Sequence, residues 1–215
     1  MELERNAVWD IVHTHIKEDH LLKHCLSVEI AMRAYAKKFG EDEAYWGAVG
    51  ALHDIDFEKY PDEHCEHTAE ILAPLGYDEE FICNIRSHMR TWPKERTLIQ
   101  KTLLACDEMP GFIIACLLVR PDKNIANLPA KSVMKKFKDK AFAKAISRDT
   151  MKESAADLGV EIKDHIEFLV QAFVEEDGRF VFAGTNEEAR MAAEEAFVEA
   201  RDSGAYPNIG LVLPE

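Results

Sequence analysis

The sequence predicts an all-α protein, and two observations carry this prediction. Apolar residues recur at steps of three and four along most of the chain, which is the spacing of one face of an amphipathic helix. Glycine, proline and acidic residues also stand at positions suited to helix ends. We therefore expect a bundle of helices up to about residue 176.

The first two long helices are predicted by residues 19–53. Apolar residues at helical spacing predict a helix over residues 19–39, which Gly40 ends. Glu41 suits the positive end of the next helix. That helix becomes almost wholly apolar over residues 48–52 before it reaches His53–Asp54. An apolar helix with small residues is typical of a central helix packed on several sides.

The rest of the main body is predicted to be helical after a loop at residues 55–63. We expect helices at about residues 64–75, 78–89, 93–109, 112–119, 130–138, 148–158 and 161–176. Pro110-Gly111 should kink or break the helix between residues 93–109 and 112–119, because proline lacks a backbone donor and clashes with the preceding turn.

The character of the sequence changes at residue 177. Residues 179–182 have strand propensity, Asn186 can cap a helix, and residues 209–213 look extended. We therefore divide the chain into a helical domain, residues 1–176, and a strand–helix–strand appendage, residues 177–215. The appendage is too small to be stable alone, so it should pack on the main domain or on a second subunit, as in a homodimer.

Composition and charge narrow the class of protein. The 215 residues are 47% hydrophobic and 31% charged, which is an ordinary globular mix. A formal net charge of −14 disfavours a nucleic-acid partner, because the average field repels a polyanion. No apolar run approaches the roughly 20 residues that span a bilayer. The N-terminus lacks the pattern of a signal peptide, so we expect a cytoplasmic protein without a membrane partner.

One stretch, residues 130–148, is basic although the chain as a whole is acidic. Between residues 130 and 148 seven basic residues accompany a single acid, Asp139. On charge grounds alone Lys135, Lys136 and Arg120 are candidates to bind a substrate phosphate. The alternative is a solvated helix face or a subunit contact.

The five cysteines are odd in number, scattered, and form no CxxC pair. This pattern disfavours a disulfide framework and a zinc–thiolate site. We expect buried, reduced thiols, and no thiolate competing with the histidines for a metal.

Histidines and aspartates stand at positions that suit a metal site. His24 lies in the first long helix, His53–Asp54 end the buried helix, and Asp107 lies within a later one. Adjacent helical residues point about 100° apart, so His53 and Asp54 can reach one metal only where the helix ends or where the metal sits close to the helix axis. A buried, unpaired carboxylate costs several kcal/mol, and a metal removes that cost.

The chain resembles a known family over about residues 5–175. The similarity is carried by LLKHCLSVEIAMRAYAKKFG, GALHDIDFEKYPDEHCEHTAEIL, IRSHM and LLACDEMPGFIIACLLVRP. In this order they resemble the HD-domain metal-dependent phosphohydrolases, and most closely the small bacterial branch with an HDID or HDIG signature. The resemblance implies a helical bundle and metal ligands at His24, His53, Asp54 and Asp107.

Further histidines match members of the family that bind two metals. The resemblance places His64 and His88 at the extra ligand positions of those members. His67, three residues after His64, is open as an outer-shell residue or a substrate contact. The proline and glycine of the HPxxG motif, a second histidine at Met89 and the GYP motif are absent. Cleavage of cyclic dinucleotides is therefore not expected.

The resemblance implies hydrolysis of a phosphate ester or anhydride of a nucleotide or another small phosphorylated metabolite, and metal-activated water would carry out this reaction. Asp54 and His53 would be the catalytic pair. One or two divalent ions are expected, with Fe, Mn or Zn preferred to Mg because histidine-rich sites do not suit magnesium. The alternatives are a non-catalytic sensor of a nucleotide or metal, and a structural helical protein.

Overall fold

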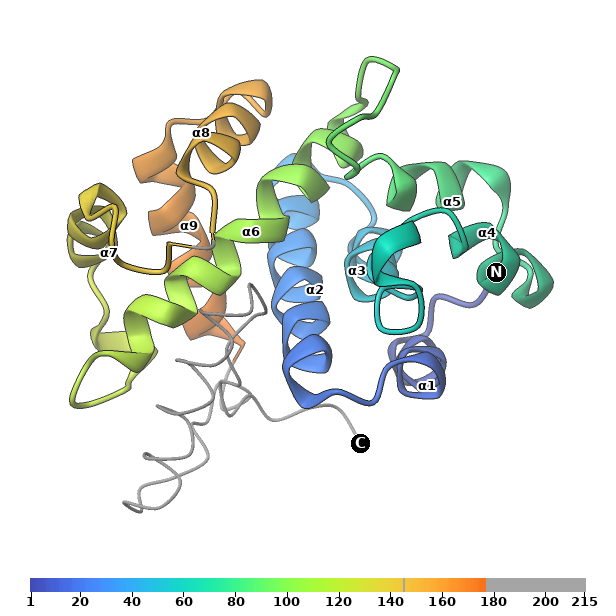
Figure 1. Cartoon of the computed structure of the whole chain (residues 1–215), viewed down its shortest axis with the longest axis horizontal. Helices are drawn as coiled ribbons and strands as arrows, with labels where there is room; N and C mark the ends of the chain where they lie inside the picture. Colours follow the sequence, from blue (N-terminus) through green and yellow to red (C-terminus); the bar gives the residue numbers. More distant parts are fainter. Residues whose placement is uncertain (145, 177–215) are drawn as a thin grey trace. The chain divides into compact units, whose positions relative to one another are not determined.

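The computed structural model describes residues 1–144 and 146–176, which form two compact units. The first unit is Met1–Asp107, and the described part of the second is residues 108–176. Every regular element within these described ranges is helical, which confirms the predicted all-α class (Figure 1). The predicted strand–helix–strand appendage, residues 177–215, lies outside the described residues. No helix of the described part is long and apolar enough to cross a membrane.

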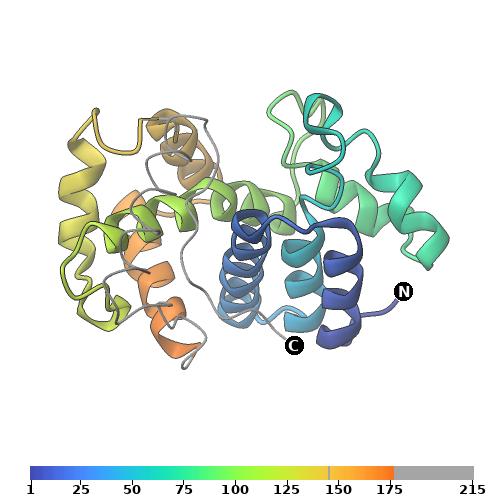
Figure 2. The same ribbon diagram turned by 60° about the horizontal axis from the view of Figure 1, so that its bottom comes forward.

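The first unit is built around helix α3. Its elements are α1 (Arg5–His15), α2 (Asp19–Phe39), α3 (Glu43–Leu52), η1 (Pro61–Glu63), α4 (Thr68–Leu72), η2 (Ala73–Leu75), α5 (Glu79–Arg86) and the beginning of α6 (Leu98–Leu118). Helix α3 contacts α1, α2 and α5, and Figure 2 shows it between α1 and α2. Its residues from Trp46 to Leu52 are all buried, as the apolar sequence predicts for a central helix.

Local signals set the ends of several helices. Helix α2 has the predicted bounds, and Gly40 follows it in the left-handed conformation with φ 75°. The Asp42 carboxylate caps α3 by accepting hydrogen bonds from the backbone N–H groups of Ala44 and Tyr45. Helix α1 was not among the predicted helices, and its cap is Glu4, which is not one of the preferred capping residues.

Three predicted boundaries in the first unit are wrong. The helix expected from His64 begins only at Thr68, because Cys65 has a left-handed backbone with φ 69°. The helix expected to reach Met89 ends at Arg86, and the one expected from Pro93 begins at Leu98.

Helix α6 also passes through Pro110 without a break, contrary to the predicted separation. The missing N–H of proline costs a helical hydrogen bond, but Met109 and the residues that follow are buried. Burial of an apolar face is the main source of helix stability in proteins, and it outweighs the local preference here.

Gly50 allows α2 and α3 to approach closely. A Cβ at this position would lie 2.9 Å from the backbone oxygen of Val28 and 3.0 Å from Cα of Glu29. Backbone atoms cannot step aside as a flexible side chain does. Replacing Gly50 with alanine should therefore lower the free energy of unfolding by about 2 kcal/mol, a typical cost of overpacking a core. Urea denaturation of metal-free protein measures this change, and an unchanged midpoint would contradict the close approach.

The described part of the second unit is arranged around α9. It contains the end of α6, η3 (Ile125–Asn127), α7 (Ala130–Lys138), α8 (Arg148–Asp157) and α9 (Ile162–Glu175). Helix α9 contacts α7, α8 and η3. The bounds of α7, α8 and α9 agree with the predicted ranges to within one residue.

Candidate metal centre

The first cluster of metal-binding side chains joins α2, the end of α3 and α6. The Nε2 atoms of His24 and His53 lie 2.9 Å apart. Oδ1 of Asp107 lies 3.3 Å from Nε2 of His24 and 3.7 Å from Nε2 of His53. One ligand atom from each residue lies within 4.8 Å of the others, so a single ion could contact all three. The structure thus brings together residues predicted from distant parts of the sequence.

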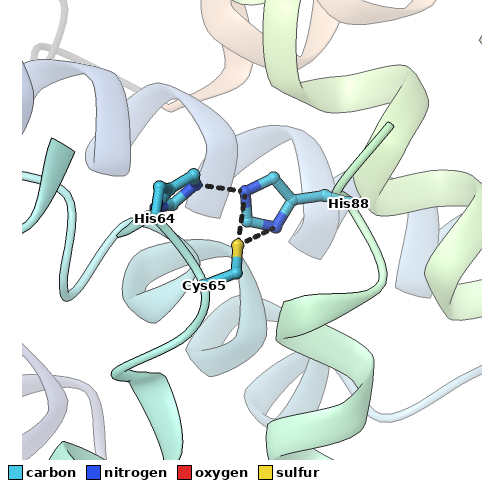
Figure 3. A group of neighbouring side chains, drawn as sticks. All are labelled: His64, Cys65 and His88. Atoms are coloured by element: carbon cyan, nitrogen blue, oxygen red, sulfur yellow. Dashed lines mark hydrogen bonds between the residues drawn. The ribbon is translucent and has the colours of Figure 1, made fainter. Parts of the chain in front are cut away.

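The second cluster contains a residue that the sequence did not suggest. The Nε2 atoms of His64 and His88 lie 2.8 Å apart. The Sγ atom of Cys65 lies 3.6 Å from Nε2 of His88, and Figure 3 shows the three side chains directed toward one another. Their ligand atoms also lie within 4.8 Å of one another. A thiol therefore lies within ligand distance of these histidines, although no sequence pattern predicted one there.

Asp54 connects the two clusters. Its Oδ2 lies 3.4 Å from Nε2 of His24. Its Oδ1 lies 3.3 Å from Nε2 of His53 and 3.2 Å from Nε2 of His64. The same Oδ1 is 3.6 Å from Nε2 of His88. One carboxylate thus faces four imidazoles, two from each cluster.

The fold presents these side chains from helix ends as well as from helix interiors. His24 lies within α2 and Asp107 within α6. His53 is the C-terminal cap of α3, and Asp54 follows in the turn, so both can reach one point. His64 follows η1, and His88 follows α5.

Three of the histidines are held in one orientation by hydrogen bonds at Nδ1. The Nδ1 atom of His53 lies 2.8 Å from the carbonyl oxygen of Gly50, and that of His88 lies 2.6 Å from the carbonyl oxygen of Ile85. His64 makes the equivalent contact with Oδ1 of Asp56, at 2.9 Å. An Nδ1–H that donates to these oxygens leaves the Nε2 lone pair for the cluster, as in metal-ligating histidines.

The electrostatics of the two clusters are dominated by carboxylate–imidazole pairs. Burial lowers the pKa of His24, but Asp107 and Asp54 outweigh it and raise this pKa to about 9. Burial also lowers the pKa of His64, but the Asp54 and Asp56 carboxylates outweigh this effect and raise the pKa to about 12. Burial raises the pKa of Asp54, but the surrounding imidazoles hold it well below its ordinary value. This direction favours the ionised form of the Asp54 carboxylate.

The donor set fits a divalent transition metal. Imidazole nitrogens and carboxylate oxygens are ligands for such ions. Two aspartates and four histidines, three of them oriented through Nδ1, give the two clusters oxygen and nitrogen donors for a cation. Whether each of the six predicted ligands binds a metal stays a prediction.

The model of the HD domain matches residues 21–118 of the chain, a stretch that contains both clusters and Asp54. These residues belong to the HD-domain family. The finer assignment to an HDID or HDIG branch stays a prediction. Comparison with curated proteins and with solved structures gives no significant match.

Asp56, the second acid of the HDID sequence, contacts the turn that carries His64 and Cys65. Asp56 is fully buried, and its Oδ1 accepts a hydrogen bond from the backbone N–H of Cys65 at 3.2 Å. Its Oδ2 accepts from the backbone N–H of His67 at 3.2 Å and from the hydroxyl of Thr68 at 2.9 Å. Together with its contact to His64, Asp56 shapes the whole turn from 64 to 68. The sequence showed this acid in the signature but not its partners.

Replacing Asp56 with alanine should weaken metal binding at the His64–His88 cluster by about 10- to 100-fold, the usual cost of losing an outer-shell partner. The His24–His53 cluster does not contact Asp56 and should keep its affinity. Isothermal titration of metal-free protein with Zn²⁺ measures the affinities of both clusters. Equal weakening of all bound zinc, or none, would contradict a positioning role confined to the second cluster.

Other predicted residues lie outside the two clusters. His67 stacks on Tyr60 with ring centroids 3.8 Å apart, and its ring nitrogens contact the carboxylates of Glu63 and Glu70. It therefore stays outside the ligand set. Arg120, Lys135 and Lys136 line one pocket of about 400 Å³ within the second unit.

The three basic residues of that pocket are not equivalent. The Arg120 guanidinium makes two hydrogen bonds of 2.9 Å to the Asp122 carboxylate, and Nζ of Lys136 lies 4.6 Å from the ring centroid of Phe142. The role of all three basic residues as substrate ligands stays a prediction.

Proposed function

We propose that this protein is a metal-dependent phosphohydrolase that acts on a phosphate ester or anhydride of a nucleotide or another small phosphorylated metabolite. The observation that carries the proposal is the position of Asp54, whose carboxylate contacts both histidine clusters. Two adjacent donor sets joined by one carboxylate are suited to a pair of metal ions that act on one phosphate. HD-domain membership supports the same reaction class.

A bound divalent ion would polarise a phosphoryl oxygen and lower the pKa of water toward neutrality. The exposure of the cluster side chains indicates the side from which a substrate would reach them. His24, His53 and His88 are buried, whereas the side chains of His64 and Asp107 are 22% and 21% exposed. A phosphate would therefore approach from the side of His64 and Asp107.

Asp54 has a more specific part than the sequence suggested. Surrounding imidazoles keep its pKa well below the ordinary value against the opposing effect of burial. A carboxylate with such a pKa accepts a proton poorly at neutral pH. Its contacts with four imidazoles, two from each cluster, support the same part, and we assign Asp54 to holding and orienting positive charge at the centre.

The donor set also bears on the identity of the metal. Magnesium prefers oxygen ligands and retains several waters, whereas imidazole-rich sites suit Mn, Fe and Zn. The four histidines of the two clusters therefore favour one of these three ions.

The test uses full-length protein freed of metal and reloaded separately with Mn²⁺, Fe²⁺, Zn²⁺ and Mg²⁺. Bound metal is measured by elemental analysis, and phosphate release from a generic phosphate ester and a nucleotide panel is measured in parallel. We expect metal-dependent release with at least one of Mn²⁺, Fe²⁺ and Zn²⁺.

Two negative outcomes have different meanings. Bound metal without phosphate release under any condition would overturn the hydrolase and support a nucleotide or metal sensor. No bound metal and no thermal shift on adding metal would remove the metal centre itself, and would leave a structural role for the histidines.

A further inference from the structure

We propose that Cys65 is a thiolate ligand of a divalent metal held together with His64 and His88, which makes this half of the centre a mixed nitrogen–sulfur site. The proposal rests on the metal centre of the proposed function, but not on hydrolytic activity. It assigns a role to a residue that sequence motifs do not mark as a ligand.

The first argument is the convergence of the three side chains. The Sγ atom of Cys65 lies 3.6 Å from Nε2 of His88, and the Nε2 atoms of the two histidines lie 2.8 Å apart. Figure 3 shows that the sulfur and both rings are directed toward one region. All three ligand atoms lie within 4.8 Å of one another, so one ion could contact them together.

The second argument is that a fourth donor is already present. Oδ1 of Asp54 lies 3.2 Å from Nε2 of His64 and 3.6 Å from Nε2 of His88. With Cys65 included, two nitrogens, one sulfur and one carboxylate oxygen gather at this cluster. Four donors of these types are the usual complement of zinc, which takes thiolate, imidazole and carboxylate ligands in tetrahedral sites.

The third argument is the backbone at Cys65. Its φ of 69° is left-handed, a conformation that cysteine rarely adopts and that costs of order 1 kcal/mol. Asp56 holds this conformation by accepting hydrogen bonds from the backbone N–H of Cys65 and from Nδ1 of His64. Consecutive side chains of an extended chain point to opposite faces, whereas this turn directs His64 and Cys65 to the same cluster.

The remaining cysteines provide the contrast. Cys25, Cys106 and Cys116 are also buried, and Cys83 is partly exposed. Among the described residues only Cys65 joins a histidine cluster of metal-binding geometry. Burial alone therefore does not explain its place.

Ligation by Cys65 has a chemical consequence. As the sulfur–metal bond forms, the thiol proton leaves to solvent and the sulfur donates a lone pair to the ion. Thiolate donors favour Zn, Fe and Co over Mg and Ca. The second cluster should thus select a softer metal than the cysteine-free first cluster.

Cobalt substitution tests the proposal directly. Metal-free, full-length protein is titrated with Co²⁺ under reducing conditions, and bound cobalt is determined by elemental analysis. We expect a sulfur-to-cobalt charge-transfer band in the near ultraviolet. Cys65→Ser should lose this band and bind cobalt at the second cluster at least about tenfold more weakly. The matched control, Cys83→Ser, alters a thiol outside both clusters and should retain the band.

A measurement on the unaltered protein removes any dependence on the folding of the variant. X-ray absorption at the zinc edge of the zinc-loaded protein should show sulfur in the first shell at about 2.3 Å. Bound metal with neither sulfur scattering nor a charge-transfer band would overturn the proposal and leave Cys65 as a hydrogen-bonding neighbour of His88. Sulfur ligation without phosphate release would instead sustain this inference while the proposed hydrolase fails.

Discussion

Replacing Asp54 with alanine is expected to remove metal from both clusters and to abolish phosphate release. The carboxylate contacts His24 and His53 on one side and His64 and His88 on the other. The substitution removes a predicted ligand and a negative charge that would attract the cations. The activity should fall by more than the roughly 10- to 100-fold that the loss of an outer-shell partner costs.

The experiment compares Asp54→Ala with Asp62→Ala, which removes an exposed acid from η1. Metal content by elemental analysis and helicity by circular dichroism are measured for both variants. Helicity should persist in each, because the buried apolar residues that stabilise the helices are unchanged. Full metal content and activity in Asp54→Ala would refute the assignment. Loss of metal in Asp62→Ala would show that removing any nearby acid releases the metal, and that Asp54 has no special role.

The second large effect concerns stability and centres on Glu29, a buried residue of α2. Its carboxylate accepts hydrogen bonds from Nε and Nη2 of Arg5, at 2.6 and 2.9 Å. It also accepts from the indole N–H of Trp9 at 2.8 Å and from Nε of Arg33 at 2.7 Å. Arg5 and Trp9 belong to α1, so this one carboxylate ties α1 to α2.

Glu29→Ala should lower the free energy of unfolding by about 3 kcal/mol, because it leaves two guanidinium groups and a buried indole N–H without this acceptor. Water around the partly exposed arginines recovers some of the loss. Arg33→Ala should cost less, since Glu29 keeps its α1 partners, and Glu41→Ala at an exposed site should change little. Urea denaturation of the metal-free variants measures the series. An equal, small effect for all three would contradict the role of Glu29.

Much of the helical fold could be predicted from local patterns in the sequence. The bounds of α2 and α7 follow from apolar spacing and end signals that act within a few residues. The failures arise where distant packing overrides such signals. Helix α6 continues through Pro110 among buried residues, and the turn before α4 is set by Asp56 rather than by its own sequence.

The candidate site divides in the same way. The types of residue at His24, His53–Asp54 and Asp107, and their order, pointed to a metal centre before any distance was known. Two other features required the structure. Neither the four partners of Asp56 nor the approach of Cys65 to His88 leaves a pattern in the sequence.

The amino-acid sequence by itself determined the helical class, the chemistry of the donors and the HD signature, because these depend on composition and on contacts between near neighbours. Only the tertiary structure decided that one carboxylate serves two histidine clusters and that a thiol joins one of them. Those arrangements bring together side chains from residue 24 to residue 107, and their approach depends on how separate helices of the first unit pack.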